Sequence, residues 1–170
     1  MQELSERASI PVSQIEAIEA NQGMPSLAPL IAIARVLGVR LGTFLDDNTA
    51  LGPAVLRADN AVKSIHFANS SSDDRPHISY KPLASEKAGR HFDPFMIDVE
   101  PLDEGDFVLS SHEGEEFIYV LAGSLEINYG KETYVLNAGD SIYYDSIIAH
   151  HVHAATAEGA KILAVVYAPL

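Results

Sequence analysis

The chain of 170 residues contains no cysteine, so disulfide bonds and thiolate metal sites are excluded. This absence leaves the redox compartment undetermined. No stretch approaches 18 consecutive apolar residues, and the N-terminus lacks the basic-then-apolar order of a secretory signal. We therefore predict no membrane partner and expect a cytoplasmic protein.

Basic residues are scarce. Lys and Arg total 11 against 24 Asp and Glu, a net charge of −13. The first 48 residues hold three arginines and six acidic residues, a net charge of −3, so no basic domain is concealed in the total. The composition therefore lacks the sequence-independent attraction to phosphate that supplies most non-specific affinity for nucleic acid.

The first third of the chain has a helical hydrophobic period. Apolar residues recur about one helical turn apart in three segments between residues 4 and 37, which predicts short helices. Pro11 suits a first helical turn, Gly38 is a typical helix stop, and residues 41–45 predict a last short turn. The packing face expected for the longest helix comprises Leu27, Leu30, Ile31, Ala34 and Leu37.

This segment resembles the repressor-type helix-turn-helix family of bacteria and phages. The matching residues lie in 4–8, 15–19, 25–27 and 33–39. The resemblance implies a recognition helix from about Val12 to Ala20, operator DNA as a partner, and assembly as a homodimer or higher homo-oligomer. It also implies that four side chains of this helix face base edges: Val12, Ser13, Gln14 and Ala17.

Two features depart from that family. The predicted recognition helix contains no Arg or Lys, although Gln14 could read adenine through two hydrogen bonds. The family also has a helix ahead of this segment, so the chain is expected to start within the second helix. Either DNA binding or a helical bundle used only for packing and dimerisation is consistent with these residues.

The rest of the chain predicts strands separated by short turns. After the connector at 49–60, alternating segments begin with residues 61–67, 77–83 and 94–100. Further strands are predicted at 117–121, 125–129, 133–136, 141–144, 150–154 and 161–167, with Gly123 ending the first of these. Regular short strands with glycine turns are typical of an antiparallel barrel or jelly roll.

This second segment resembles the cupin superfamily. The first cupin motif matches His112, Glu116 and Gly123, while Ser110 stands where that family has another histidine. The second motif matches Gly139 and His150. The whole chain is thus expected to be α+β: a small helix-turn-helix bundle at 1–48, a linker at 49–60 and a cupin β-barrel at 61–170.

The cupin motifs mark a candidate metal site. His112 and Glu116 lie four residues apart, so on extended backbone both side chains share one face, and His150 arrives from another strand. Two histidines and one carboxylate form a ligand set for divalent metals that leaves coordination positions open. The resemblance implies iron, manganese, nickel or zinc, and an empty polar cluster is the alternative.

Other residues are candidates for binding a small molecule. The candidate ligand-pocket residues are Tyr80, Arg90 and Tyr119. If the barrel senses a metabolite and the helices bind an operator, these residues would bind that small-molecule effector. This hypothesis assigns no catalytic residue. The same layout resembles a mononuclear iron epoxidase, so an iron-dependent oxygenase with a vestigial helical segment is the rival. A metal-free binding module is a third alternative.

Overall fold

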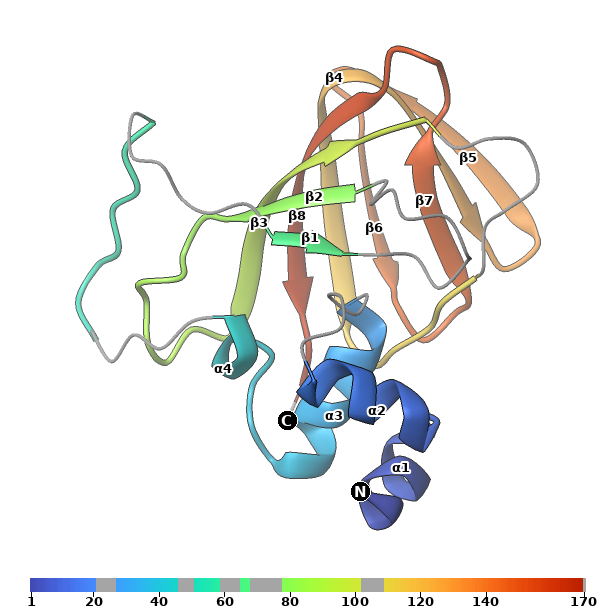
Figure 1. Ribbon diagram of the computed structural model, residues 1–170. Coiled ribbons are helices and arrows are strands. Elements are labelled where there is room, and N and C mark those ends of the chain that lie inside the picture. Colours follow the sequence, from blue (N-terminus) through green and yellow to red (C-terminus); the bar gives the residue numbers. More distant parts are fainter. Residues whose placement is uncertain (21–26, 46–50, 59–64, 68–77, 102–108, 170) are drawn as a thin grey trace.

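The computed structural model places a small group of helices against one end of a β-barrel (Figure 1). The structure describes residues 1–20, 27–45, 51–58, 65–67, 78–101 and 109–169. Within these ranges, no helix is long and apolar enough to cross a membrane. The α+β prediction, with helices first and an antiparallel barrel after them, is confirmed.

Among the described residues, the N-terminal group contains four helices: α1 (Gln2–Ala8), α2 (Val12–Glu19), α3 (Leu27–Leu37) and α4 (Gly42–Leu45). Ser9 turns the chain between α1 and α2 with a left-handed φ of 56°, and Ser5 Oγ donates to the carbonyl of Ile10 at 2.6 Å. Buried side chains of α1, α2, α3 and the turn between α1 and α2 form a small core of their own: Ala8, Ile10, Ile15 and Ile33.

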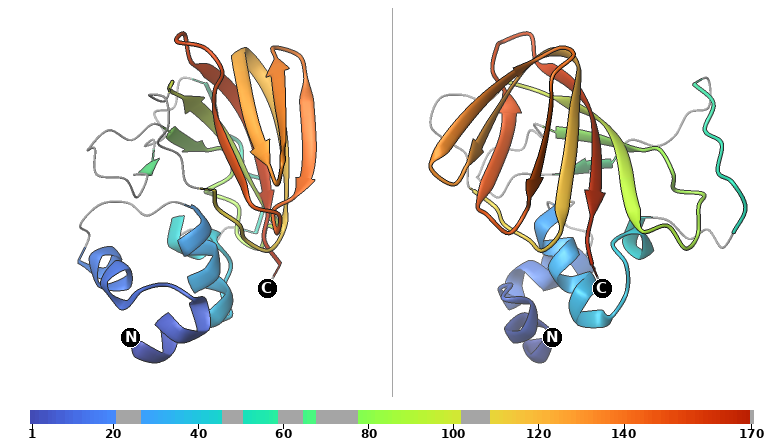
Figure 2. Two further views of the ribbon diagram at one scale, coloured as in Figure 1. Left: turned by 90° about the vertical axis from the view of Figure 1, so that its right-hand side faces the viewer. Right: turned by 180° about the vertical axis from the view of Figure 1, so that it is seen from behind.

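Helix α3 packs in two directions. Ile33 belongs to the small core shared with α1 and α2, whereas Leu30 and Ile31 belong to the large core of the barrel. Leu41, just after this helix, also joins the barrel core. The helix therefore covers the end of the barrel (Figure 2). Leu37 is 54% exposed, so the prediction that it shares the packing face is wrong.

The barrel consists of antiparallel strands. Its first sheet runs in the order β1-β2-β3-β8-β4-β6, and the second half of β4 pairs with β5 and β7 to form the other wall. The strands are β1 (Ile65–Phe67), β2 (Ile78–Pro82), β3 (Phe92–Val99), β4 (Glu115–Tyr129), β5 (Glu132–Asn137), β6 (Ser141–Asp145), β7 (His150–Ala154) and β8 (Ala160–Tyr167).

Strand β4 corrects the prediction that Gly123 ends a strand. The chain continues through Gly123 as one strand of 15 residues, which passes from the first sheet into the second. The register shifts between Val120 and Ala122, and Gly123 has a φ of +76°. A Cβ atom at Gly123 would lie 2.2 Å from the carbonyl oxygen of Gly159, so glycine is needed there for close packing rather than for a turn.

Parts of the predicted linker and first strands fall outside the described residues, namely 46–50, 59–64, 68–77 and 102–108. The described part of the linker, 51–58, has no helix or strand. Lys87 Nζ donates to the carbonyl of Leu51 at 3.0 Å. The boundaries at 48 and 60 stay predictions.

Substituting Gly123 by alanine should destabilise the barrel by about 3 kcal/mol, because the new Cβ atom meets backbone and the positive φ is strained. Gly139→Ala is the matched control, since Gly139 also has a positive φ but a Cβ atom added there would have no atom within 4 Å. The control should lose about 1 kcal/mol. Urea unfolding measures both, and equal losses would contradict the packing role of Gly123.

Candidate metal centre

Backbone hydrogen bonds join the loop that carries His112 to the start of β7, which carries His150. Ser110 and His150 exchange both backbone hydrogen bonds, each at 2.9 Å. The His112 amide donates to the carbonyl of Ser146 at 3.0 Å, and the Ser146 amide donates to Gly114 at 2.9 Å. Ser110 therefore fixes the backbone of His150 from the position where the related motif has a histidine.

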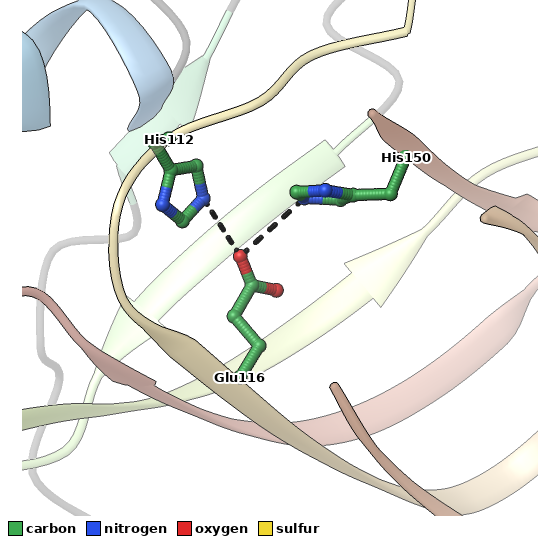
Figure 3. A group of neighbouring side chains, drawn as sticks. All are labelled: His112, Glu116 and His150. Atoms are coloured by element: carbon green, nitrogen blue, oxygen red, sulfur yellow. Dashed lines mark hydrogen bonds and ion pairs between the residues drawn. The ribbon is translucent and has the colours of Figure 1, made fainter. Parts of the chain in front are cut away.

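The carboxylate of the centre comes from the start of β4. Glu116 Oε1 lies 2.9 Å from His112 Nε2 and 3.6 Å from His150 Nε2 (Figure 3). The ligand atoms of the three residues all lie within 4.8 Å of one another. The three side chains predicted as metal ligands are thus brought together, with each exposed by 12% or less.

Each imidazole is oriented by its other ring nitrogen. His112 Nδ1 donates to the carbonyl of Glu113 at 3.1 Å, and His150 Nδ1 donates to the carbonyl of Ile148 at 2.8 Å. Carbonyl oxygens only accept, so both Nδ1 atoms carry a hydrogen and both Nε2 atoms face Glu116. Nδ1–H bonds of this kind hold metal-binding histidines in the correct tautomer. The donor set therefore fits a divalent metal.

Tyr144 on β6 supports the carboxylate from its other side. Its hydroxyl donates to Glu116 Oε2 at 2.7 Å, and the buried Ser146 hydroxyl lies 3.4 Å from Oε1. The Tyr144 ring also lies against His150, with 5.1 Å between ring centroids. Oε2 is thus held by a tyrosine, which leaves Oε1 facing the two imidazoles.

The electrostatics keep Glu116 ionised. Burial alone would raise the pKa of this carboxyl, but the hydrogen bonds and charges of His112 and His150 lower it far below its ordinary value. Burial would lower the pKa of His150, yet Glu116 raises it. The pKa of Tyr144 is raised by burial and by the neighbouring carboxylate, so its hydroxyl remains a donor.

The predicted ligand-pocket residues lie in different places. The ring of Tyr80 meets Phe95 edge-on, and burial and then the charge of Glu116 raise the pKa of the Tyr80 hydroxyl. Arg90 instead pairs with Asp93 at 2.5 Å and donates to the carbonyl of Lys87 at 3.0 Å. Tyr119 is 38% exposed and faces away from the buried side of β4.

Two residues that contact the centre were not identified from the sequence. Tyr144 lies opposite Glu116 across β4 and β6, a register that becomes visible only once the strands are paired. Glu113 lies in an exposed loop, and its carboxylate forms an ion pair with Arg35 of α3. No pattern in the sequence links Tyr144 to Glu116 or Glu113 to Arg35.

The four predicted DNA-facing residues all lie on α2, which is the predicted recognition helix. Ser13 is exposed, whereas Val12, Gln14 and Ala17 are partly buried. None of the four belongs to either buried core cluster. Whether they contact bases stays a prediction.

Comparison with known families supports both halves of the chain. A helix-turn-helix family model matches residues 1–44, and a cupin domain model matches residues 97–166. We therefore identify these segments as a helix-turn-helix module and a cupin domain. This combination supports a DNA-binding regulator. No curated protein matches the chain.

Solved structures share the fold. A helix-turn-helix family transcriptional regulator from Vibrio cholerae is 19% identical with a TM-score of 0.68, covering 98% of this chain and 85% of its own. An iron(II) form of HppE is 23% identical with a TM-score of 0.58, covering 96% and 88%. Hydroxypropylphosphonic acid epoxidase from S. wedmorenis is 23% identical with a TM-score of 0.50, covering 96% and 87%.

Replacing Tyr144 by phenylalanine should weaken the binding of a divalent metal about tenfold, because Glu116 Oε2 loses its hydrogen-bond donor. Calorimetric titration of the metal-free protein with Mn(II) measures the affinity. Tyr119→Phe is the control, since this tyrosine lies on the outer side of the sheet and should bind metal like the wild type. Equal affinity in all three proteins would show that Tyr144 does not position the carboxylate.

Proposed function

We propose that the protein is a DNA-binding transcriptional regulator whose barrel senses a small molecule through a divalent metal. His112, Glu116 and His150 would hold the metal, and α2 would contact an operator through Val12, Ser13, Gln14 and Ala17. A bound metal would act as a Lewis acid that binds an oxygen atom of the effector. Iron, manganese, nickel and zinc all suit this donor set. A location in the cytoplasm stays part of the proposal.

The observation that carries this proposal is the ion pair between Arg35 and Glu113. Arg35 lies on α3, and the carbonyl of Glu113 accepts the hydrogen bond that orients His112. One residue thus contacts both the helical module and a metal ligand. A change in the position of His112 would therefore reach α3 through a single residue.

The packing of α3 supports the same coupling. Leu30 and Ile31 belong to the continuous core that also contains Tyr144, the hydrogen-bond donor to Glu116. On its other side, Ile33 packs with Ile15 of α2. A ligand can shift a conformational equilibrium only by binding its two states differently. Here α3 is linked to His112 through Glu113 and packs with Ile15 of the recognition helix, so a shift of α3 would affect both.

DNA binding is tested by selecting bound sequences from a random duplex library at low salt. The wild-type chain should enrich a defined site, and Gln14→Ala should weaken binding to it about tenfold or more through loss of a base contact. Gln2→Ala is the matched control, because Gln2 is an exposed glutamine at the start of α1, outside the predicted recognition helix. Failure of the wild type to bind any duplex would reject the regulatory function.

Coupling is tested with Glu113→Gln, which removes the charge that Arg35 contacts but keeps the backbone carbonyl. The ratio of the DNA affinity with Mn(II) to the DNA affinity without Mn(II) should lie closer to one in this variant than in the wild type. The expected change in this ratio is about two- to fivefold, since an exposed ion pair contributes up to ~1 kcal/mol. Arg7→Gln breaks another exposed pair, with Glu3, that lies on α1 away from the barrel, and should leave the ratio unchanged. An unchanged ratio in Glu113→Gln would exclude this route.

An iron-dependent oxygenase is the second candidate function. The buried cluster of two histidines and one carboxylate favours it, and so does the fold shared with HppE. Oxygen consumption by the anaerobically iron-loaded protein, tested with hydroxylated acids and phosphonates, separates the two functions. Consumption that depends on one of these compounds and is lost in Glu116→Gln would favour the enzyme, whereas its absence from the whole panel would favour the regulator.

A further inference from the structure

Four polar side chains lie together on the outer face of the second sheet, where β7 pairs with β4 (Figure 1). Asn128 of β4 lies opposite His151 of β7, and Glu126 lies opposite His153. Residues two apart on a strand share a face, and Ile127, between the two β4 residues, is buried in the barrel core. All four side chains therefore point away from the core. We refer to them as the outer block.

Glu126 and His153 are separated as two ligands of one metal ion would be. His153 Nε2 lies 3.4 Å from Glu126 Oε1. A hydrogen bond between charged groups is shorter, at about 2.7–2.9 Å. Two ligands of a tetrahedral zinc ion, each bonded at about 2.0–2.1 Å, lie about 3.3 Å from each other. The pair therefore has the spacing of neighbouring zinc ligands.

The second imidazole lies beside the first. The ring centroids of His151 and His153 are 5.5 Å apart, and the ring planes differ by 29°. The outer torsion of a histidine side chain has broad minima, so His151 can turn a ring nitrogen toward the other two residues at little cost. His151 is 8% exposed, and the side chain of His153 is 15% exposed. Both imidazoles are thus largely shielded from water, where electrostatic interactions are stronger than at an open surface.

Asn128 supplies a fourth possible donor atom. Its Nδ2 donates to Thr133 Oγ1 of β5 at 3.1 Å, so the amide nitrogen is used on the side of β4 away from β7. Its Oδ1 is buried and accepts no hydrogen bond from the part of the chain that the structure describes. A buried acceptor without a donor is costly, and a cation at the outer block would pair with it.

We propose that the outer block binds a zinc ion through His151, His153 and Glu126, with the amide oxygen of Asn128 as the fourth ligand. Imidazole ligands favour zinc over magnesium and calcium, which prefer sites made of oxygen atoms alone. Four protein ligands leave no open position, which is the arrangement of a structural zinc site rather than a catalytic one. The ion would join β4 to β7, the strand that begins with His150.

This proposal goes beyond the regulatory function, because it would hold equally for an enzyme. The outer block shares no residue with the metal centre, and its side chains lie on the opposite face of the same strands. Zinc at the outer block and metal at the centre can therefore be measured separately.

The first test counts zinc ions per chain by equilibrium dialysis at micromolar free zinc, followed by elemental analysis. His153→Ala should bind one zinc ion fewer than the wild type, whether or not the metal centre also takes up zinc. His91→Ala is the matched control, because His91 is an exposed histidine outside the outer block, and it should bind as many ions as the wild type. Equal counts in all three proteins, or the same loss in both variants, would overturn the proposal.

A second test removes the metal centre and measures the outer block alone by calorimetric titration with zinc. The double variant His112→Ala/Glu116→Gln, which lacks two ligands of the centre, should still bind one zinc ion. In this background Asn128→Asp should tighten binding about tenfold, because a carboxylate replaces the amide oxygen. Asn137→Asp adds the same charge on β5 outside the outer block and should leave the affinity unchanged.

Loss of all zinc binding from a folded double variant, or equal affinities with Asn128→Asp and Asn137→Asp, would overturn the proposal. If the double variant failed to fold, the counts for His153→Ala and His91→Ala in the otherwise unchanged chain would still decide. A wild-type chain that binds zinc at the outer block but binds no DNA would reject the regulatory function and leave this site standing.

Discussion

The structure depends on one buried negative charge, the carboxylate of Glu116. An ionised carboxylate away from water is costly unless it is paired and hydrogen-bonded. Here two imidazoles face one oxygen and the hydroxyl of Tyr144 donates to the other. The imidazoles are held in turn by the backbone carbonyls of Glu113 and Ile148, and backbone hydrogen bonds join the two segments of chain that carry the imidazoles. The barrel thus holds three ligand atoms in place before any metal binds.

Helix α3 extends this constraint beyond the barrel. Its apolar side chains divide between the barrel core and the small helical core, so the helix cannot move without disturbing one of them. Arg35 adds a polar contact to the loop that carries His112. An exposed ion pair contributes little to stability, so its importance lies in connecting two parts of the molecule. The regulatory proposal rests on this geometry, and the net negative charge of the first 48 residues makes specific contacts necessary for binding DNA.

Much of this arrangement was predictable from the sequence, because periodicity and motif spacing are local signals. The stop at Gly38 and the grouping of His112, Glu116 and His150 follow from such signals, and the approximate bounds of α2 follow from the resemblance to the helix-turn-helix family. The continuation of β4 through Gly123 did not, since glycine marks turns and close backbone approaches alike. The pairing of Arg35 with Glu113 and of Tyr144 with Glu116 joins residues far apart in the sequence. Such contacts are fixed by tertiary packing, which no periodic pattern records.

The most direct test of the central claim is amide hydrogen exchange of the full chain with and without Mn(II). Binding at the barrel should change the exchange of α3 severalfold as well as that of the loop around His112, because Glu113 contacts both. Glu116→Gln, which lacks the central ligand, should show neither change. Exchange that alters only within the barrel strands and leaves α3 unaffected would contradict the account.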